Sequence, residues 1–191
     1  RGRDTLLDEG VPLVAVGAAP QHVVGAVAAG GADVRVHVEC RLLDRAHVAL
    51  LVGAELAERG LVRAATDVTG FGLLGHLASM CRASGVSAEI FGNDVPAISE
   101  EIFELIARGC VPGGTKENLK TAKAHLEWNK MPTTRRLLLA DAQTSGGLLL
   151  CVPPRKLDEV LRFLADCKTP SRAVIGGIGP SRNPLITVST T

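Results

Sequence analysis

Apolar and polar residues recur along the chain with two periods, which predict strands and helices. Residues 32–39 alternate strictly, with Val34, Val36 and Val38 on one face, as is typical of a half-buried strand. His37 lies on the polar face of this segment, so we interpret it as solvent-exposed. Shorter apolar runs predict further strands at residues 11–16, 61–66, 86–91, 148–152, 174–178 and 185–188, the last two as a closing pair.

Helical spacing that ends at glycine predicts the layers that cover these strands. Residues 42–59 are amphipathic and stop before Gly60, and residues 73–84 stop before Gly85. Further helices are predicted at residues 21–29, 99–108, 120–128 and 154–167, with a Pro/Gly loop at 110–118. Because strands and helices alternate, we expect an α/β (α+β) fold with a mixed sheet covered by helices.

The composition limits the partners of such a fold. The chain has 191 residues and a formal net charge of +1. This charge argues against binding nucleic acid by bulk electrostatics, and no apolar run reaches the ~18–20 residues of a membrane span. There are 21 glycines and 10 prolines but only four Phe, one Trp and no Tyr. This balance favours backbone loops that approach phosphates, so the glycine-rich turns are the candidate sites.

Cysteine usage indicates a reducing compartment. The five cysteines are Cys40, Cys81, Cys110, Cys151 and Cys167. No two form a C-x-x-C pair, which excludes a zinc ribbon and a thioredoxin-like motif, and we expect a cytoplasmic protein. Cys81 and Cys151 lie in apolar segments and are interpreted as buried thiols. Because the chain begins at Arg1 rather than Met, we also expect a fragment or a processed product.

The most informative segment is residues 64–76, Ala-Ala-Thr-Asp-Val-Thr-Gly-Phe-Gly-Leu-Leu-Gly-His. It predicts a strand, a glycine turn and the start of a helix, whose unpaired amides attract anions. We therefore interpret Thr69, Gly70 and Gly72 as part of an anion cradle. Asp67, at the end of the strand, suits a Mg²⁺ ion that bridges to phosphates. The alternative is that Asp67 and Thr69 only cap the helix.

The same glycines also match a dinucleotide-binding pattern. Gly70, Gly72 and Gly75 fit G-x-G-x-x-G, and Glu89 lies roughly 20 residues further on, as that pattern requires. The charge of Asp67 opposes this interpretation, since a pyrophosphate would lie beside it.

Two other glycine-rich turns, at residues 110–115 and 141–147, contain hydroxyl side chains. In the second turn, Thr144, Ser145 and Gly146 precede an apolar strand and suit hydrogen bonds to an anion. A simple tight turn explains the same residues.

Four further polar side chains allow two interpretations each. Lys116, Arg135 and Arg136 lie near these turns and could meet a phosphate or be solvated. His76 follows the third glycine of the first turn, and we interpret it as a packing residue rather than a catalytic one.

Taken together, three motifs resemble selenophosphate synthetase, also called selenide, water dikinase. They are Ala-Thr-Asp-Val-Thr-Gly-Phe-Gly-Leu-Leu-Gly-His at 65–76, Val-Pro-Gly-Gly-Thr at 111–115 and Asp-Ala-Gln-Thr-Ser-Gly-Gly-Leu-Leu at 141–149. Their order and spacing resemble the carboxy-terminal domain of that family over residues 60–191. Residues 1–59 form an unmatched segment that we expect to pack with this domain.

The resemblance implies the superfamily of aminoimidazole ribonucleotide synthetase, with an ATP-binding amino-terminal domain and a homodimer. It implies that the full-length enzyme converts ATP, selenide and water to selenophosphate, AMP and phosphate with Mg²⁺. Asp67 matches the magnesium-binding aspartate of the family, and no catalytic residue is expected in this chain. The residues expected to bind ATP are Thr69, Gly70, Gly72, Thr144, Ser145 and Gly146.

Two other functions stay open on the sequence. A truncated relative could act as a non-catalytic interaction or regulatory module, since the chain contains no P-loop and no family nucleophile. A dinucleotide-binding domain is the second alternative.

Overall fold

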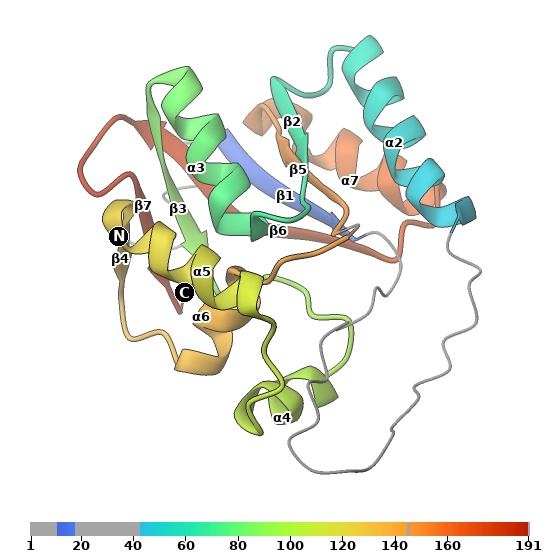
Figure 1. Ribbon diagram of the computed structural model, residues 1–191. Helices are drawn as coiled ribbons and strands as arrows, with labels where there is room; N and C mark the ends of the chain where they lie inside the picture. Colours follow the sequence, from blue (N-terminus) through green and yellow to red (C-terminus); the bar gives the residue numbers. More distant parts are fainter. Residues whose placement is uncertain (1–10, 18–42, 145, 191) are drawn as a thin grey trace.

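The computed structural model describes residues 11–17, 43–144 and 146–190, which contain one seven-stranded sheet (Figure 1). The strands are β1 (Val11–Gly17), β2 (Ala64–Asp67), β3 (Val86–Phe91), β4 (Leu126–Trp128), β5 (Leu148–Cys151), β6 (Ser171–Pro180) and β7 (Ile186–Ser189). Their order across the sheet is β2-β5-β1-β6-β3-β7-β4. Neighbouring strands are antiparallel except for the parallel pairs β3–β7 and β7–β4.

Helices cover both faces of this sheet. They are α2 (Leu43–Glu58), α3 (Gly72–Ser84), α4 (Glu101–Ala107), α5 (Gly113–Ala122), α6 (Thr133–Leu139) and α7 (Leu157–Asp166), with 3-10 turns η1 (Lys123–His125) and η2 (Pro154–Lys156). In Figure 1, α2 and α7 lie on one side of the sheet, and α3, α5 and α6 lie on the other. The predicted class, a mixed sheet covered by helices, is confirmed.

The alternation of side chains along the strands creates two hydrophobic cores. Leu13 and Leu149 point into the core under α3, whereas their neighbours Val14 and Leu150 point into the core under α2 and α7. All four side chains are fully buried. Strand β5 is buried on both faces, which explains why its sequence is continuously apolar rather than alternating.

Most of the predicted elements in the described residues are confirmed within a few positions. The confirmed segments are the strands at 11–16, 86–91, 148–152, 174–178 and 185–188 and the helices at 42–59, 73–84, 99–108 and 154–167. The strand predicted at 61–66 begins only at Ala64. The helix at 21–29, the strand at 32–39, His37 and Cys40 lie outside the described residues.

The predictions for residues 110–139 are partly wrong. The loop at 110–118 contains the start of α5, which begins directly after Pro112 and buries Thr115. The helix predicted at 120–128 ends early, because the last three of these residues form β4 beside β7. Helix α6 was not predicted. In each case tertiary packing overrides a weak local signal.

Two topological expectations are also wrong. Strands β6 and β7 do not form a closing pair, since β3 lies between them. Strands β2 and β3 flank α3 in the chain but are separated in the sheet by β5, β1 and β6. They therefore form no dinucleotide-binding βαβ unit. Glu89 lies in β3, where its carboxylate is 3.8 Å from the guanidinium of Arg182, so the dinucleotide alternative fails.

The prediction of buried, reduced thiols at Cys81 and Cys151 is confirmed. Both are free and buried, and burial raises the pKa of each to about 11. The Cys151 thiol lies 3.3 Å from the sulfur of Met80. These two cysteines are therefore neutral packing groups rather than nucleophiles.

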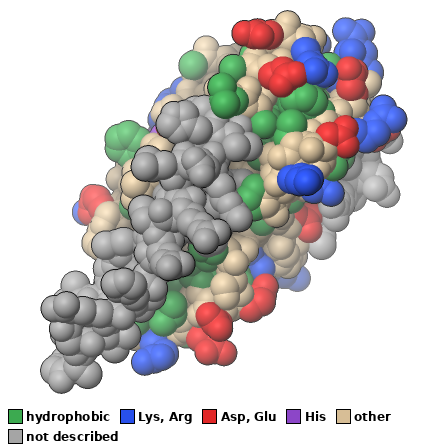
Figure 2. All heavy atoms as spheres, turned by 90° about the vertical axis from the view of Figure 1, so that its right-hand side faces the viewer, with side chains coloured by type: hydrophobic (Ala, Val, Ile, Leu, Met, Phe, Trp, Pro, Cys, Tyr) green, Lys and Arg blue, Asp and Glu red, His purple; other side chains and the backbone are tan. Residues whose placement is uncertain are grey.

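The described surface carries charges of both signs. Figure 2, which turns the right-hand side of Figure 1 toward the viewer, shows Lys and Arg side chains interspersed with Asp and Glu. This mixture accords with the net charge of +1. Among the described residues, no helix has both the length and the apolar character needed to cross a membrane.

Candidate functional site

Asp67 occupies the end of β2, the edge strand beside α3. It lies opposite Leu148 in the pairing of β2 with β5, and it is exposed. The chain then turns through residues 68–71 and enters α3. The carboxylate therefore lies directly before the first glycine turn and is accessible to a soluble ligand.

The start of α3 has no side-chain cap. Its N-cap residue is Phe71, and no side-chain oxygen accepts a hydrogen bond from the first amides of the helix. The alternative in which Asp67 and Thr69 serve only to cap the helix is therefore wrong. The ring of Phe71 is exposed, and its centroid lies 5.8 Å from that of His76.

His76, which lies in α3, forms hydrogen bonds with the first glycine turn. Its Nε2 atom accepts the Thr69 backbone N–H at 3.1 Å and lies 3.1 Å from the Thr69 hydroxyl. The ring is half-buried. This nitrogen is satisfied by the loop that the ring supports, as a packing role for His76 predicts.

The third motif runs alongside the first turn and is joined to it by backbone hydrogen bonds. The Val68 N–H donates to Gly147 O at 2.9 Å, the Gly146 N–H donates to Val68 O at 2.8 Å, and the Gln143 N–H donates to Thr69 O at 3.1 Å. These bonds continue the pairing of β2 with β5 beyond the strand ends. They bring together two motifs that are distant in sequence.

Two of the predicted ligand-binding glycines have a packing reason for their identity. Gly72 has a φ of 67°, and a Cβ there would lie 2.7 Å from the carbonyl of Ala140. A Cβ on Gly146 would collide with the Gln143 side chain and lie 2.8 Å from Val68 O. Both glycines therefore allow the first and third motifs to approach each other closely.

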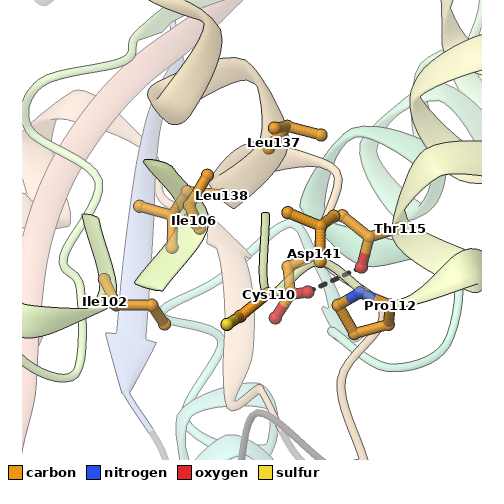
Figure 3. Close-up of a pocket in the computed structure, with 9 residues that line it drawn as sticks. Ile102, Ile106, Cys110, Pro112, Thr115, Leu137, Leu138 and Asp141 are labelled. Atoms are coloured by element: carbon orange, nitrogen blue, oxygen red, sulfur yellow. Dashed lines mark hydrogen bonds between the residues drawn. The ribbon is translucent and has the colours of Figure 1, made fainter. Parts of the chain in front are cut away.

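The second motif joins the same assembly through Thr115. Its hydroxyl donates to Asp141 Oδ1 at 2.7 Å (Figure 3). The same hydroxyl accepts the Ala142 N–H at 3.2 Å. Burial raises the pKa of Asp141, and the hydrogen bonds from Thr115 and Ala142 oppose this shift. The Thr115 hydroxyl thus joins α5 to the third motif and is not free for a ligand.

A small apolar pocket lies beside this pair, between α4, α5 and α6 (Figure 3). Ile102, Ile106 and Leu138 contribute to its walls, and Asp141 and Thr115 lie at its polar end. It encloses about 10 Å³, which is room for a single water molecule. The pocket is too small for a nucleotide. The candidate site is the first glycine turn, beside which Asp67 is exposed.

One residue of the assembly carries no signal in the sequence. Asn118 in α5 donates through Nδ2 to Gly70 O at 2.8 Å and to Ala140 O at 3.1 Å. It therefore links the first glycine turn to the residue that precedes the third motif. Its role was hidden because the start of α5 resembles a loop in the sequence.

The three basic side chains near the glycine turns, Lys116, Arg135 and Arg136, differ in whether they are free to meet a phosphate. Arg135 donates to Val95 O at 3.2 Å and stacks 4.3 Å above the ring of Phe103. Arg136 donates to Met131 O at 2.8 Å and also stacks on an aromatic ring, that of Trp128. Both arginines are thus engaged in packing. Lys116 is exposed on α5.

The remaining predicted ligands lie on the third motif. Thr144 is exposed, and Ser145 lies outside the described residues. Among the described residues, no three His, Cys, Asp or Glu side chains gather into a metal-binding group. Asp67 is therefore a single carboxylate beside a loop assembly, and its assignment as a metal ligand stays a prediction.

Solved structures with a similar fold establish the architectural class of the chain. One is phosphoribosylformylglycinamidine synthase II from Thermotoga maritima, with a TM-score of 0.53 and 15% identity, over 92% of this chain and 24% of that one. Another is T. maritima PurL complexed with ATP, with a TM-score of 0.56 and 15% identity, over 95% of this chain and 23% of that one. At this identity the likeness concerns the fold alone.

The sequence defines the family. The chain belongs to the family of AIR synthase related proteins and matches their C-terminal domain over residues 9–188. It is similar to the selenide, water dikinase of Photorhabdus laumondii, with 42% identity over 137 residues, 72% of this chain and 38% of the relative. It is also similar to that of Cronobacter sakazakii, with 52% identity over 102 residues, 53% of this chain and 28% of the relative.

These relatives confirm the resemblance to selenide, water dikinases, and they set its extent. The chain spans well under half of the length of either relative.

Proposed function

We propose that this chain forms the carboxy-terminal part of a selenophosphate synthetase. The complete enzyme would convert ATP, selenide and water to selenophosphate, AMP and phosphate. The observation that supports this most directly is the hydrogen-bonded assembly of the first and third motifs, with Asp67 exposed at its edge. Relatives that are 42% and 52% identical carry the name selenide, water dikinase.

Mg²⁺ fits the chemistry of Asp67. This ion binds oxygen ligands and is commonly held by one or two carboxylates, with substrate phosphates and water completing its shell. One exposed carboxylate at the mouth of a glycine turn meets that requirement. Bound there, Mg²⁺ would neutralise charge on the phosphates of ATP.

The loop residues divide into a scaffold and a binding surface in this proposal. The N–H groups of Gly72 and Gly146 already donate to Thr69 O and Val68 O, so these two glycines shape the cradle. Gly70 has open space above it, since a Cβ there would meet nothing within 4 Å. We therefore assign the phosphate contacts to the backbone around Gly70 and to the hydroxyls of Thr144 and Ser145. The Thr69 hydroxyl lies 3.1 Å from His76 Nε2, so Thr69 shapes the turn in this proposal.

The rest of the proposal concerns what joins this chain. We assign the ATP-binding domain to the part of the protein that this chain does not contain. The complete two-domain protein would form a cytoplasmic homodimer. Within this chain, residues 1–59 would pack with the domain at 60–191. Strand β1, which lies within residues 1–59, pairs with β5 on one side and β6 on the other and so contributes an inner strand to the same sheet.

Replacement of Asp67 tests the proposed site. In the full-length protein, Asp67→Asn should lower the formation of AMP and selenophosphate by about 100-fold, because it removes a charge that positions the metal and phosphates. Both products can be followed by phosphorus NMR. The matched control is Asp158→Asn, an exposed carboxylate in the first turn of α7, on the other side of the sheet.

Equal turnover in the Asp67→Asn and Asp158→Asn proteins would reject the metal role of Asp67. If the parent full-length protein itself formed no selenophosphate, the non-catalytic alternative would replace the enzyme.

A further inference from the structure

The carboxamide of Asn118 lies between two backbone segments that are far apart in the sequence. Thr115 and Asn118 are three residues apart on α5 and so lie on the same face of the helix. Thr115 contacts the third motif through Asp141, and Asn118 contacts both Gly70 O and Ala140 O. A carboxamide NH₂ has two hydrogens, so it can serve both carbonyls at once.

The bond to Gly70 O determines the direction of the next amide. The peptide between Gly70 and Phe71 is trans, because the only cis peptide among the described residues is Asn183–Pro184. In a planar trans peptide the C=O and N–H point in opposite directions. Since Gly70 O points toward α5, the Phe71 N–H points away from α5.

That amide is available to a ligand. Among the described residues, the Phe71 N–H donates to no backbone carbonyl, and the start of α3 has no side-chain cap. The turn beside it is uncrowded, since a Cβ added at the exposed Gly70 would meet nothing within 4 Å apart from its chain neighbours. An anion at this amide would also be close to the start of the helix, which favours negative charge.

We propose that Asn118 is a positioning residue, which holds Gly70 O against α5 and thereby presents the Phe71 N–H to a phosphate oxygen of ATP. This inference rests on the proposed function and adds a residue to it. Asn118 itself touches no substrate. It acts through the orientation of one peptide group and through the fixed distance between the first and third motifs.

The substitution Asn118→Ala in the full-length protein tests the proposal by kinetics. The KM for MgATP should rise about tenfold while kcat changes less, because a supporting hydrogen bond to a binding loop is lost. The variant Asn118→Asp keeps the size of the side chain but removes its donors, and it should show the same rise. This second variant serves if the alanine protein folds poorly.

Leu119→Ala is the matched control for stability. Leu119 is the next residue of α5, and its apolar side chain packs against the core under α3. It should lower the Tm and leave the KM for MgATP unchanged. If Asn118→Ala and Leu119→Ala changed Tm and KM in the same proportion, Asn118 would be only a structural residue and the proposal would fail.

Hydrogen exchange supplies a readout that does not depend on turnover. In the parent full-length protein, MgATP should slow exchange in the peptide that covers residues 68–74. The Asn118 variants should exchange faster there and lose this protection at the same MgATP concentration, whereas Leu119→Ala should retain it. Full protection in the Asn118 variants would overturn the positioning role.

The same experiment separates the two proposals. If MgATP protects the parent turn but Asp67→Asn still turns over normally, the metal assignment fails and the Asn118 result stands. If MgATP gives no protection in the parent protein, the Phe71 N–H is not a phosphate donor, and the inference fails irrespective of activity.

Discussion

Gly72 and Gly85 show at the residue scale how similar backbone angles can have different consequences. Gly72 has a φ of 67° and Gly85 a φ of 64°, a region that side chains disfavour. A Cβ on Gly72 would lie 2.7 Å from the Ala140 carbonyl, whereas a Cβ on Gly85 would meet nothing within 4 Å. Gly85 therefore needs only its backbone conformation, and Gly72 also needs the absence of a side chain.

These surroundings predict two different costs. Gly85→Ala should destabilise the protein by about 1 kcal/mol, the penalty of a left-handed backbone alone. Gly72→Ala should cost at least about 2 kcal/mol more, because the third motif must also move away from the first. Urea unfolding of both variants measures the difference. Equal losses would show that the contact with Ala140 is easily relieved.

The raised pKa of Asp141 predicts that the stability of the protein depends on pH. Burial raises its pKa above the ordinary value of 3.8, and the Thr115 and Ala142 hydrogen bonds offset part of this. A raised pKa means that the folded protein binds the proton more tightly than the unfolded chain. The stability contributed by Asp141 is therefore present at low pH and is lost as the pH rises from the ordinary value through the raised one.

Asp141→Asn should remove this loss, because the amide keeps an acceptor for the Thr115 hydroxyl and does not ionise. Urea midpoints from about pH 4 to pH 7 should fall less with pH in the variant than in the parent protein. Parallel curves for the two proteins would contradict the assignment of this titration to Asp141.

The candidate site was only partly predictable at this scale. Asp67 and the first and third motifs follow from a strand that ends in glycine-rich turns, since such turns are encoded locally. The link made by Asn118 could not be foreseen, because it depends on where α5 packs and on two carbonyls that belong to other segments. The capping role of Thr69 was wrong because its amide and hydroxyl meet His76.

At the scale of elements, α7 shows how a helix is fixed to the sheet. Its fully buried side chains are Val160 and Leu164, which face the core under α2 and α7. The periodic spacing in the sequence predicts this face directly. A helix this short is only marginally stable in isolation, so most of the stability of α7 comes from its packing against the sheet.

Leu164→Ala should destabilise the protein by about 2–5 kcal/mol, as expected for a cavity in a packed core. Arg162→Ala, two residues earlier on the exposed side of the same helix, should change stability by less than about 0.5 kcal/mol. Thermal or urea unfolding compares the two. A small effect at Leu164 would mean that the core closes around the missing side chain.

Among the described residues, elements with a continuous apolar run or an amphipathic face were predicted, whereas short elements without either were missed. The apolar run of β5 is evident because both of its faces are buried, and the amphipathic face of α7 is evident because one side of the helix is buried. By contrast, α5 begins with two glycines after Pro112, which is typical of a turn. The short β4 exists only because β7 offers an edge with which it pairs.

At the scale of the whole molecule, the proposal predicts the size of the natural product. The protein isolated from cells should be longer than this chain by an ATP-binding domain, as its span of the relatives leads us to expect. Intact-mass spectrometry measures this directly. A mature product no longer than the 191 residues of this chain would favour the non-catalytic interaction or regulatory module.

The sequence by itself determined the two periods, the resulting mixed fold and the three motifs, because these depend on neighbouring residues and on which face is buried. The tertiary structure alone decided the strand order, which separates β2 from β3 and removes the dinucleotide interpretation. It also decided that the three motifs meet and that Asn118 joins them. Such contacts join residues far apart in the chain, so no local pattern encodes them.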